Sequence, residues 1–172
     1  GYAISRKVLY TLDAGHFHPT EVISAKISAV LQFVDSILLH VSRGVRWDSD
    51  HVITLDDELQ RIMDEIVWNN YDERVFIGLD YFDASINRIA AWAVGMRNAR
   101  KAILNSCLAP VNALREAEYH ADYTQRLAKL EDRKTMPFGL VWAYYCESRD
   151  IAPDGIWLND VKRYEQDVLS KR

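Results

Sequence analysis

Residues 7–19 read KVLYTLDAGHFHP, and this stretch decides the fold class. Its first part, residues 7–12, is rich in β-branched and aromatic residues and is short enough for a buried strand. Two comparable runs follow, SILLHV at 36–41 and RVFIGLD at 74–80. Apolar residues recur every three or four positions after each run, as on one face of a helix. Strands that alternate with helices predict an α/β fold, with a parallel sheet covered on both faces.

Three helical patterns follow these three strands. The first opens at Pro19 and Thr20. The second covers residues 54–68 and begins at Thr54, whose hydroxyl can cap a helix. The third covers residues 85–108. The sequence therefore predicts three consecutive strand–helix units.

The remainder of the chain is expected to be helical. Pro110 suits the first turn of a new helix, and apolar residues then recur at helical spacing. We expect one helix to include residues 114–130, with further helices after it. The predicted organisation is βα units over residues 1–109 and a helical extension over residues 110–172.

Composition excludes several classes of protein. The chain has 172 residues, of which 49% are hydrophobic, and this is enough to form a core. A net charge of -4 argues against a nucleic acid held mainly by charge. No apolar run reaches the length of a membrane span, and no signal-peptide pattern is visible. Cys107 and Cys146 fit reduced thiols. We expect a cytoplasmic protein with neither a nucleic-acid nor a membrane partner.

Side chains of the types that bind metal ions lie at or just after the end of each expected strand. They are Asp13 and His16 after the first strand, His40 in the second, Asp48 and Asp50 in the next loop, and Asp80 after the third. The carboxyl ends of parallel strands converge, and carboxylates gathered there are unstable unless a cation compensates them. Gly15 allows a tight turn between Asp13 and His16. Mixed carboxylate and imidazole ligands suit Mn²⁺, Mg²⁺, Co²⁺ or Zn²⁺.

Each of these residues has a plainer interpretation when it is taken alone. An aspartate at a strand end commonly caps a turn. His40 fits a hydrogen-bonded core histidine, and Asp48 and Asp50 fit a solvated loop. Three further residues fit structural roles better than metal binding: His18, His51 and Asp83. The metal hypothesis rests on three consecutive strand ends that all supply donors of the same kind.

Three longer stretches resemble L-rhamnose isomerase. They are LDAGHFHPTEVIS at 12–24, LLHVSRGVRWDSDHV at 38–52 and GLDYFDASINRIAAW at 78–92. The resemblance extends over the whole sequence. It implies the C-terminal part of a (β/α)8 TIM barrel, with about three βα units followed by a helical extension. Because a barrel needs about 250 residues, we expect the chain to lack an N-terminal half of the enzyme.

The resemblance also implies two divalent metal ions. One ion would be held by Asp13, His40 and Asp80, together with a glutamate from outside this sequence. The other, a Mn²⁺ near the reacting carbons, would be held by His16, Asp48 and Asp50, with Asp13 as a bridge. The first ion would be Zn²⁺ or Mn²⁺. Catalytic roles would fall on His16, Asp48, Asp50 and Asp80.

The implied activity is the interconversion of L-rhamnose and L-rhamnulose by a homotetramer. The chain alone would be inactive, because ligands and much of the sugar pocket lie elsewhere. Two alternatives remain: a catalytically inert fragment, and another divalent-metal barrel enzyme such as a phosphodiesterase. The net charge of -4 argues against the phosphate groove that the latter needs.

Overall fold

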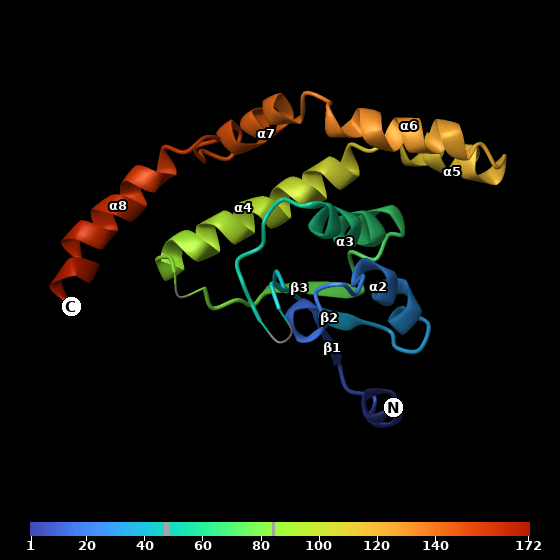
Figure 1. Cartoon of the computed structure of the whole chain (residues 1–172), viewed down its shortest axis with the longest axis horizontal. Helices are drawn as coiled ribbons and strands as arrows, with labels where there is room; N and C mark the ends of the chain where they lie inside the picture. Colours follow the sequence, from blue (N-terminus) through green and yellow to red (C-terminus); the bar gives the residue numbers. More distant parts are fainter. Residues whose placement is uncertain (47–48, 84) are drawn as a thin grey trace. The chain divides into compact units, whose positions relative to one another are not determined.

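The computed structural model describes residues 1–46, 49–83 and 85–172 (Figure 1). The chain divides into two compact units, Gly1–Ser106 and Cys107–Arg172. The first unit is α/β and the second is helical. The predicted domain boundary between residues 109 and 110 stays a prediction.

The first unit alternates strands and helices, as the sequence predicts. Its strands are β1 (Tyr10–Asp13), β2 (Ile37–Val41) and β3 (Val75–Leu79). Its helices are α1 (Tyr2–Arg6), the short 3-10 helix η1 (Ala14–His16), α2 (Ser24–Leu31), α3 (Asp57–Trp68) and α4 (Arg88–Cys107). In the described residues, no helix is both long and apolar enough to cross a membrane.

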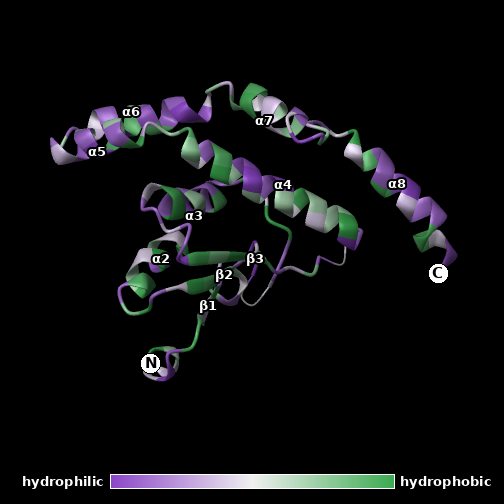
Figure 2. Ribbon diagram, turned by 180° about the vertical axis from the view of Figure 1, so that it is seen from behind, coloured by the Kyte–Doolittle hydropathy of each residue, from purple (hydrophilic) through white to green (hydrophobic). Residues whose placement is uncertain are grey.

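The strands form a parallel sheet in the order β1–β2–β3. Asp13 pairs with His40, and His40 pairs with Gly78 on the next strand. The carboxyl ends of the strands therefore lie at one edge of the sheet, which confirms the parallel arrangement expected from the sequence. Figure 2 shows the hydrophobic character of β2 and β3.

The two faces of the sheet differ in burial. Leu12 and Leu39, which are adjacent in register, are 1% and 0% exposed and belong to a core that includes residues of α2 and α3. On the opposite face, Leu38 pairs with Phe76, which is 51% exposed. The sequence predicted a sheet covered on both faces. In the described part of the chain, α2 and α3 cover only the face that carries Leu12 and Leu39.

Helix α2 begins later than the expected start at Pro19 and Thr20. It starts at Ser24, and no side chain of its own caps it. Instead, Glu58 Oε1 accepts hydrogen bonds from the backbone N–H groups of Ile23 at 2.7 Å and Ser24 at 2.9 Å. A carboxylate suits a helix N-terminus, because free N–H groups and the helix dipole both favour negative charge there.

The other end of α2 is held by Arg74, which lies just before β3. Its guanidinium donates to the carbonyl oxygens of Leu31 at 2.9 Å, Val34 at 3.1 Å and Asp35 at 2.8 Å. These carbonyls lie at and just beyond the C-terminus of α2, where a cation is favourable. Both ends of α2 are therefore completed by residues from later segments.

Helix α3 is capped by a different residue from the one expected. Asp56 is the N-cap, and its carboxylate accepts from the N–H of Leu59 at 2.9 Å. Thr54 donates to the Asp56 carboxylate at 2.9 Å. Thr54 therefore supports the cap, and α3 begins at Asp57.

A polar network joins α3 to α4, and we call Gln60, Asp64, Asn105 and Ser106 the α3–α4 network. Ser106 Oγ, which is fully buried, donates to Asp64 Oδ1 at 2.6 Å. Gln60 Nε2 donates to the same oxygen at 3.0 Å, and Asn105 donates to Gln60 Oε1 at 3.0 Å. The network fixes α3 against α4 with matched donors and acceptors.

The second unit contains four α-helices and a final turn within the described residues. They are α5 (Val111–Tyr119), α6 (Tyr123–Lys134), α7 (Phe138–Glu147), α8 (Trp157–Asp167) and η2 (Leu169–Lys171). The expected single helix over residues 114–130 is wrong. Ala121 has a φ of 55°, which ends α5, and Asp122 caps α6 by accepting from the N–H of Gln125 at 2.9 Å.

Candidate metal centre

Three of the predicted ligands meet at the carboxyl ends of the strands. His40 Nδ1 lies 3.0 Å from Asp13 Oδ2 and 3.2 Å from Asp80 Oδ2. One ligand atom from each residue lies within 4.8 Å of the others. We call Asp13, His40 and Asp80 the strand-end cluster.

The strand register explains why this cluster forms. Asp13 is opposite His40, and Asp80 directly follows β3. Gly78 lies beside His40, and a Cβ atom at Gly78 would come within 3.2 Å of the imidazole carbon Cδ2. The absence of a side chain at Gly78 therefore leaves room for the imidazole beside the two carboxylates.

A single imidazole nitrogen lies between the carboxylates of Asp13 and Asp80 in the strand-end cluster. His40 Nδ1 can carry one proton, yet it lies within 3.2 Å of carboxylate oxygens of both Asp13 and Asp80. Asp13 is only 8% exposed, so water screens its charge weakly. Two carboxylates and one imidazole suit a divalent cation such as Mn²⁺ or Zn²⁺. The donor set therefore fits a metal ion.

His16 lies beside this cluster, on the turn that follows β1. Asp13 caps η1, and its Oδ1 accepts from the N–H of Gly15 at 2.9 Å. The other oxygen, Oδ2, faces His40 and lies 3.6 Å from His16 Nε2. The His16 side chain is 61% exposed. The turn thus places the imidazole of His16 near Asp13 with an open side.

Asp50 is brought to the same turn by the loop after β2. Ser42 Oγ donates to Asp50 Oδ1 at 2.8 Å. A Cβ atom at Gly15 would lie 1.7 Å from that oxygen, so the Asp50 carboxylate occupies the place of a side chain at Gly15. Asp48 lies outside the described residues, and its predicted role stays a prediction.

Sequence reasoning missed Tyr81, the residue next to Asp80. Tyr81 is 5% exposed, and its hydroxyl donates to the carbonyl of Ala91 at 3.2 Å. Burial raises the pKa of the Tyr81 hydroxyl. A Cβ atom at Gly95 would come within 1.9 Å of this hydroxyl. The sequence feature that could have indicated this packing is a row of small residues at four-residue spacing on α4, namely Ala91, Gly95 and Ala99.

The residues that the sequence assigned to structural roles have local partners. His51 Nδ1 lies 3.5 Å from Asp83 Oδ2. Hydrogen bonds from the Ser85 hydroxyl and N–H lower the pKa of the Asp83 carboxyl. His18 Nδ1 lies 2.7 Å from the Thr20 hydroxyl.

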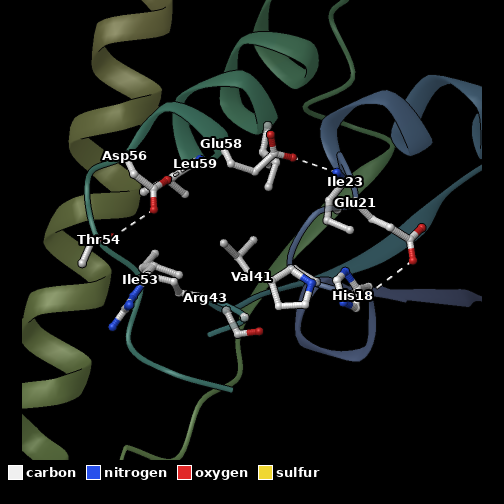
Figure 3. A pocket seen from close by; sticks show the side chains of 15 residues that line it. His18, Glu21, Ile23, Val41, Arg43, Ile53, Thr54, Asp56, Glu58 and Leu59 are labelled. Atoms are coloured by element: carbon white, nitrogen blue, oxygen red, sulfur yellow. Dashed lines mark hydrogen bonds between the residues drawn. The ribbon is translucent and has the colours of Figure 1, made fainter. Parts of the chain in front are cut away.

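A separate cavity of about 170 Å³ lies between the loop after η1, the end of β2 and the start of α3 (Figure 3). Of the described residues that line it, none belongs to the strand-end cluster. Figure 3 shows Glu58 directed to the N–H of Ile23, and Glu21 to the backbone of His18. These carboxylates hold loops and helix ends together.

Comparison with known proteins agrees with the sequence resemblance. The family model of L-rhamnose isomerase matches residues 1–172. The L-rhamnose isomerase of Rhodopirellula baltica is 60% identical over 172 residues, which are 100% of this chain and 40% of that protein. Those of Yersinia pestis and Yersinia pseudotuberculosis are 56% identical over 100% of this chain and 41% of their own length. The chain thus spans about 40% of these curated relatives, and it belongs to the L-rhamnose isomerase family.

Proposed function

We propose that this chain forms part of a metal-dependent aldose–ketose isomerase that interconverts L-rhamnose and L-rhamnulose. The observation that carries the proposal is the strand-end cluster in a member of this family. Because the chain spans 40% of the Rhodopirellula relative, the activity is proposed for the full-length protein. Its assembly as a homotetramer and its location in the cytoplasm stay predictions.

The proposed architecture is a TIM barrel to which β1, β2 and β3 contribute. Parallel strands, each followed by a helix, are the repeating unit of such a barrel. In a barrel, the exposed face with Leu38 and Phe76 would point to the interior. The strand-end cluster would then lie at the carboxyl-terminal mouth, where barrel enzymes carry their active sites.

Two groups of residues would hold divalent ions. The strand-end cluster would hold Zn²⁺ or Mn²⁺ together with a glutamate from another part of the protein. His16, Asp48 and Asp50 would hold Mn²⁺. A bound ion supplies Lewis-acid polarisation of the sugar carbonyl.

The reaction moves hydrogen between C1 and C2 of the open-chain sugar. The carboxylates of Asp48 and Asp50 would hold a water molecule that carries a proton between O1 and O2. Asp13 is held by the N–H of Gly15 at 2.9 Å, so its second oxygen keeps its direction toward His40. A site whose side chains are fixed before the substrate binds needs less reorganisation during the reaction.

The test is an assay of ketose formation from L-rhamnose by the full-length protein. We expect EDTA to abolish the activity and added Mn²⁺ to restore it. Persistence of full activity in the metal-free protein would contradict metal dependence. Failure of the Mn²⁺-loaded protein to form L-rhamnulose would contradict the proposed reaction.

A further inference from the structure

We propose that Ser42 is a positioning residue that holds the Asp50 carboxylate against the turn at Gly15, so that one oxygen of Asp50 is directed to the second divalent ion. This inference rests on the proposed function, in which Asp50 binds that ion. It assigns to Ser42 a role that acts through Asp50 and involves no contact of its own with the sugar.

The first observation is the hydrogen bond itself. Ser42 Oγ donates to Asp50 Oδ1 at 2.8 Å, and Ser42 is 8% exposed. Ser42 directly follows β2, so its backbone is anchored to the sheet. Next to this pair, the backbones of Arg43 and His51 form an antiparallel bridge, with N–O distances of 2.9 and 3.2 Å. The bridge keeps the segments that carry Ser42 and Asp50 together.

The second observation is the space that Gly15 leaves open. A Cβ atom at Gly15 would lie 1.7 Å from Asp50 Oδ1 and 2.8 Å from Ser42 Oγ. The hydrogen-bonded pair therefore fills the volume of a side chain at Gly15. The N–H of Gly15 is bound by Asp13 Oδ1 at 2.9 Å, and its carbonyl accepts from the N–H of Ser49 at 3.3 Å. One glycine thus touches carboxylates proposed for both ions.

The consequence for Asp50 is that its two oxygens are not equivalent. Oδ1 accepts the hydrogen bond from the Ser42 hydroxyl, and the proposal assigns Oδ2 to the metal ion. The backbone carbonyl of Asp50 accepts from the N–H of Phe82 at 3.1 Å, which ties the same residue to the segment after β3. Outer partners of this kind orient metal ligands, and their loss weakens metal affinity by about 10- to 100-fold.

The experiment is a calorimetric titration of the metal-free, full-length enzyme with Mn²⁺. In Ser42→Ala we expect one of the two Mn²⁺ equivalents to bind about 10- to 100-fold more weakly, while the other is unchanged. Ser42→Thr keeps a hydroxyl and is expected to restore most of the affinity. If Ser42→Ala does not fold, Ser42→Cys replaces it, because the thiol has a similar size and is a weak donor.

Ser106→Ala is the matched control. Ser106 is also a buried serine that donates to an aspartate, at 2.6 Å, but in the α3–α4 network. It should lower the melting temperature and leave both Mn²⁺ equivalents unchanged. Unaltered Mn²⁺ binding in Ser42→Ala would overturn the proposal, as would equal weakening of both equivalents. A wild-type enzyme that binds no Mn²⁺ would instead overturn the proposed metal dependence, and this inference with it.

Discussion

The strand-end cluster and the α3–α4 network are both polar groups in the first unit, but they are completed differently. In the network, Asp64 Oδ1 accepts hydrogen bonds from both Ser106 and Gln60. In the cluster, one oxygen of Asp13 and one of Asp80 face the same imidazole nitrogen of His40, and the Asp13 oxygen also lies 3.6 Å from His16 Nε2. The first arrangement satisfies its polar groups within the fold, whereas the second presents a donor set that fits a cation.

The largest effect is expected from Asp13→Asn in the full-length enzyme. The amide keeps an acceptor for the Gly15 N–H but removes the charge that the cluster offers to an ion. We expect Mn²⁺ affinity and isomerase activity to fall by more than the roughly 100-fold that loss of an outer partner causes. Titration with Mn²⁺ checks this. Asp64→Asn is the control. Equal weakening of Mn²⁺ binding in Asp64→Asn would contradict the difference between the strand-end cluster and the α3–α4 network.

Gly15→Ala should have the second-largest effect on Mn²⁺ affinity. The new methyl group would overlap Asp50 Oδ1, which lies 1.7 Å from the Cβ position, and would displace the carboxylate. We expect Mn²⁺ affinity to fall about tenfold or more, as measured by titration of the metal-free enzyme. Gly139→Ala is the matched control, because a Cβ atom there would meet no described atom within 4 Å beyond its chain neighbours and the backbone of its own helix. Wild-type Mn²⁺ affinity in Gly15→Ala would show that the site tolerates a shifted Asp50.

The effect of Ser106→Ala should fall on stability alone. The substitution removes the buried donor that lies 2.6 Å from Asp64 Oδ1, and the weaker contact from Gln60 at 3.0 Å remains. We expect the free energy of unfolding to decrease by about 1–3 kcal/mol, measured by urea denaturation of the full-length enzyme. An unchanged denaturation midpoint would mean that the network contributes little to the stability of the fold.

Glu58→Gln should have the smallest effect. Glu58 is a third kind of carboxylate, since its donors are the backbone N–H groups of Ile23 and Ser24. The amide keeps an acceptor but loses the charge at the helix N-terminus, so we expect a loss of about 1 kcal/mol. Urea denaturation measures the loss. Glu131→Gln, at an exposed ion pair on α6, should change stability less.

The same contrast explains what the sequence could predict. The strands and the strand-end ligands follow local patterns: apolar runs, and donors placed directly after them. Asp13, His40 and Asp80 meet because parallel register brings strand ends together. The role of Ser42 and the space that Gly15 leaves for Asp50 could not be predicted in this way, because both depend on a loop that returns Asp50 to the first turn.

The sequence predicted the start of α2 and the continuity of α5 with α6 wrongly, and the cause is related. The start of α2 depends on Glu58, which is 34 and 35 residues away from the groups that it caps. The break between α5 and α6 depends on the left-handed backbone of Ala121, a residue type that favours helices. In both places, distant or backbone effects override the local propensity.

The capping of α2 also bears on the order in which the protein folds. An isolated helix of eight residues does not persist in water. Its N-terminus is completed by Glu58 and its C-terminus by Arg74, which belong to segments synthesised later. Long loops must close before these contacts form. Although α2 precedes α3 and β3 along the chain, it should acquire protection from hydrogen exchange only as those two elements dock.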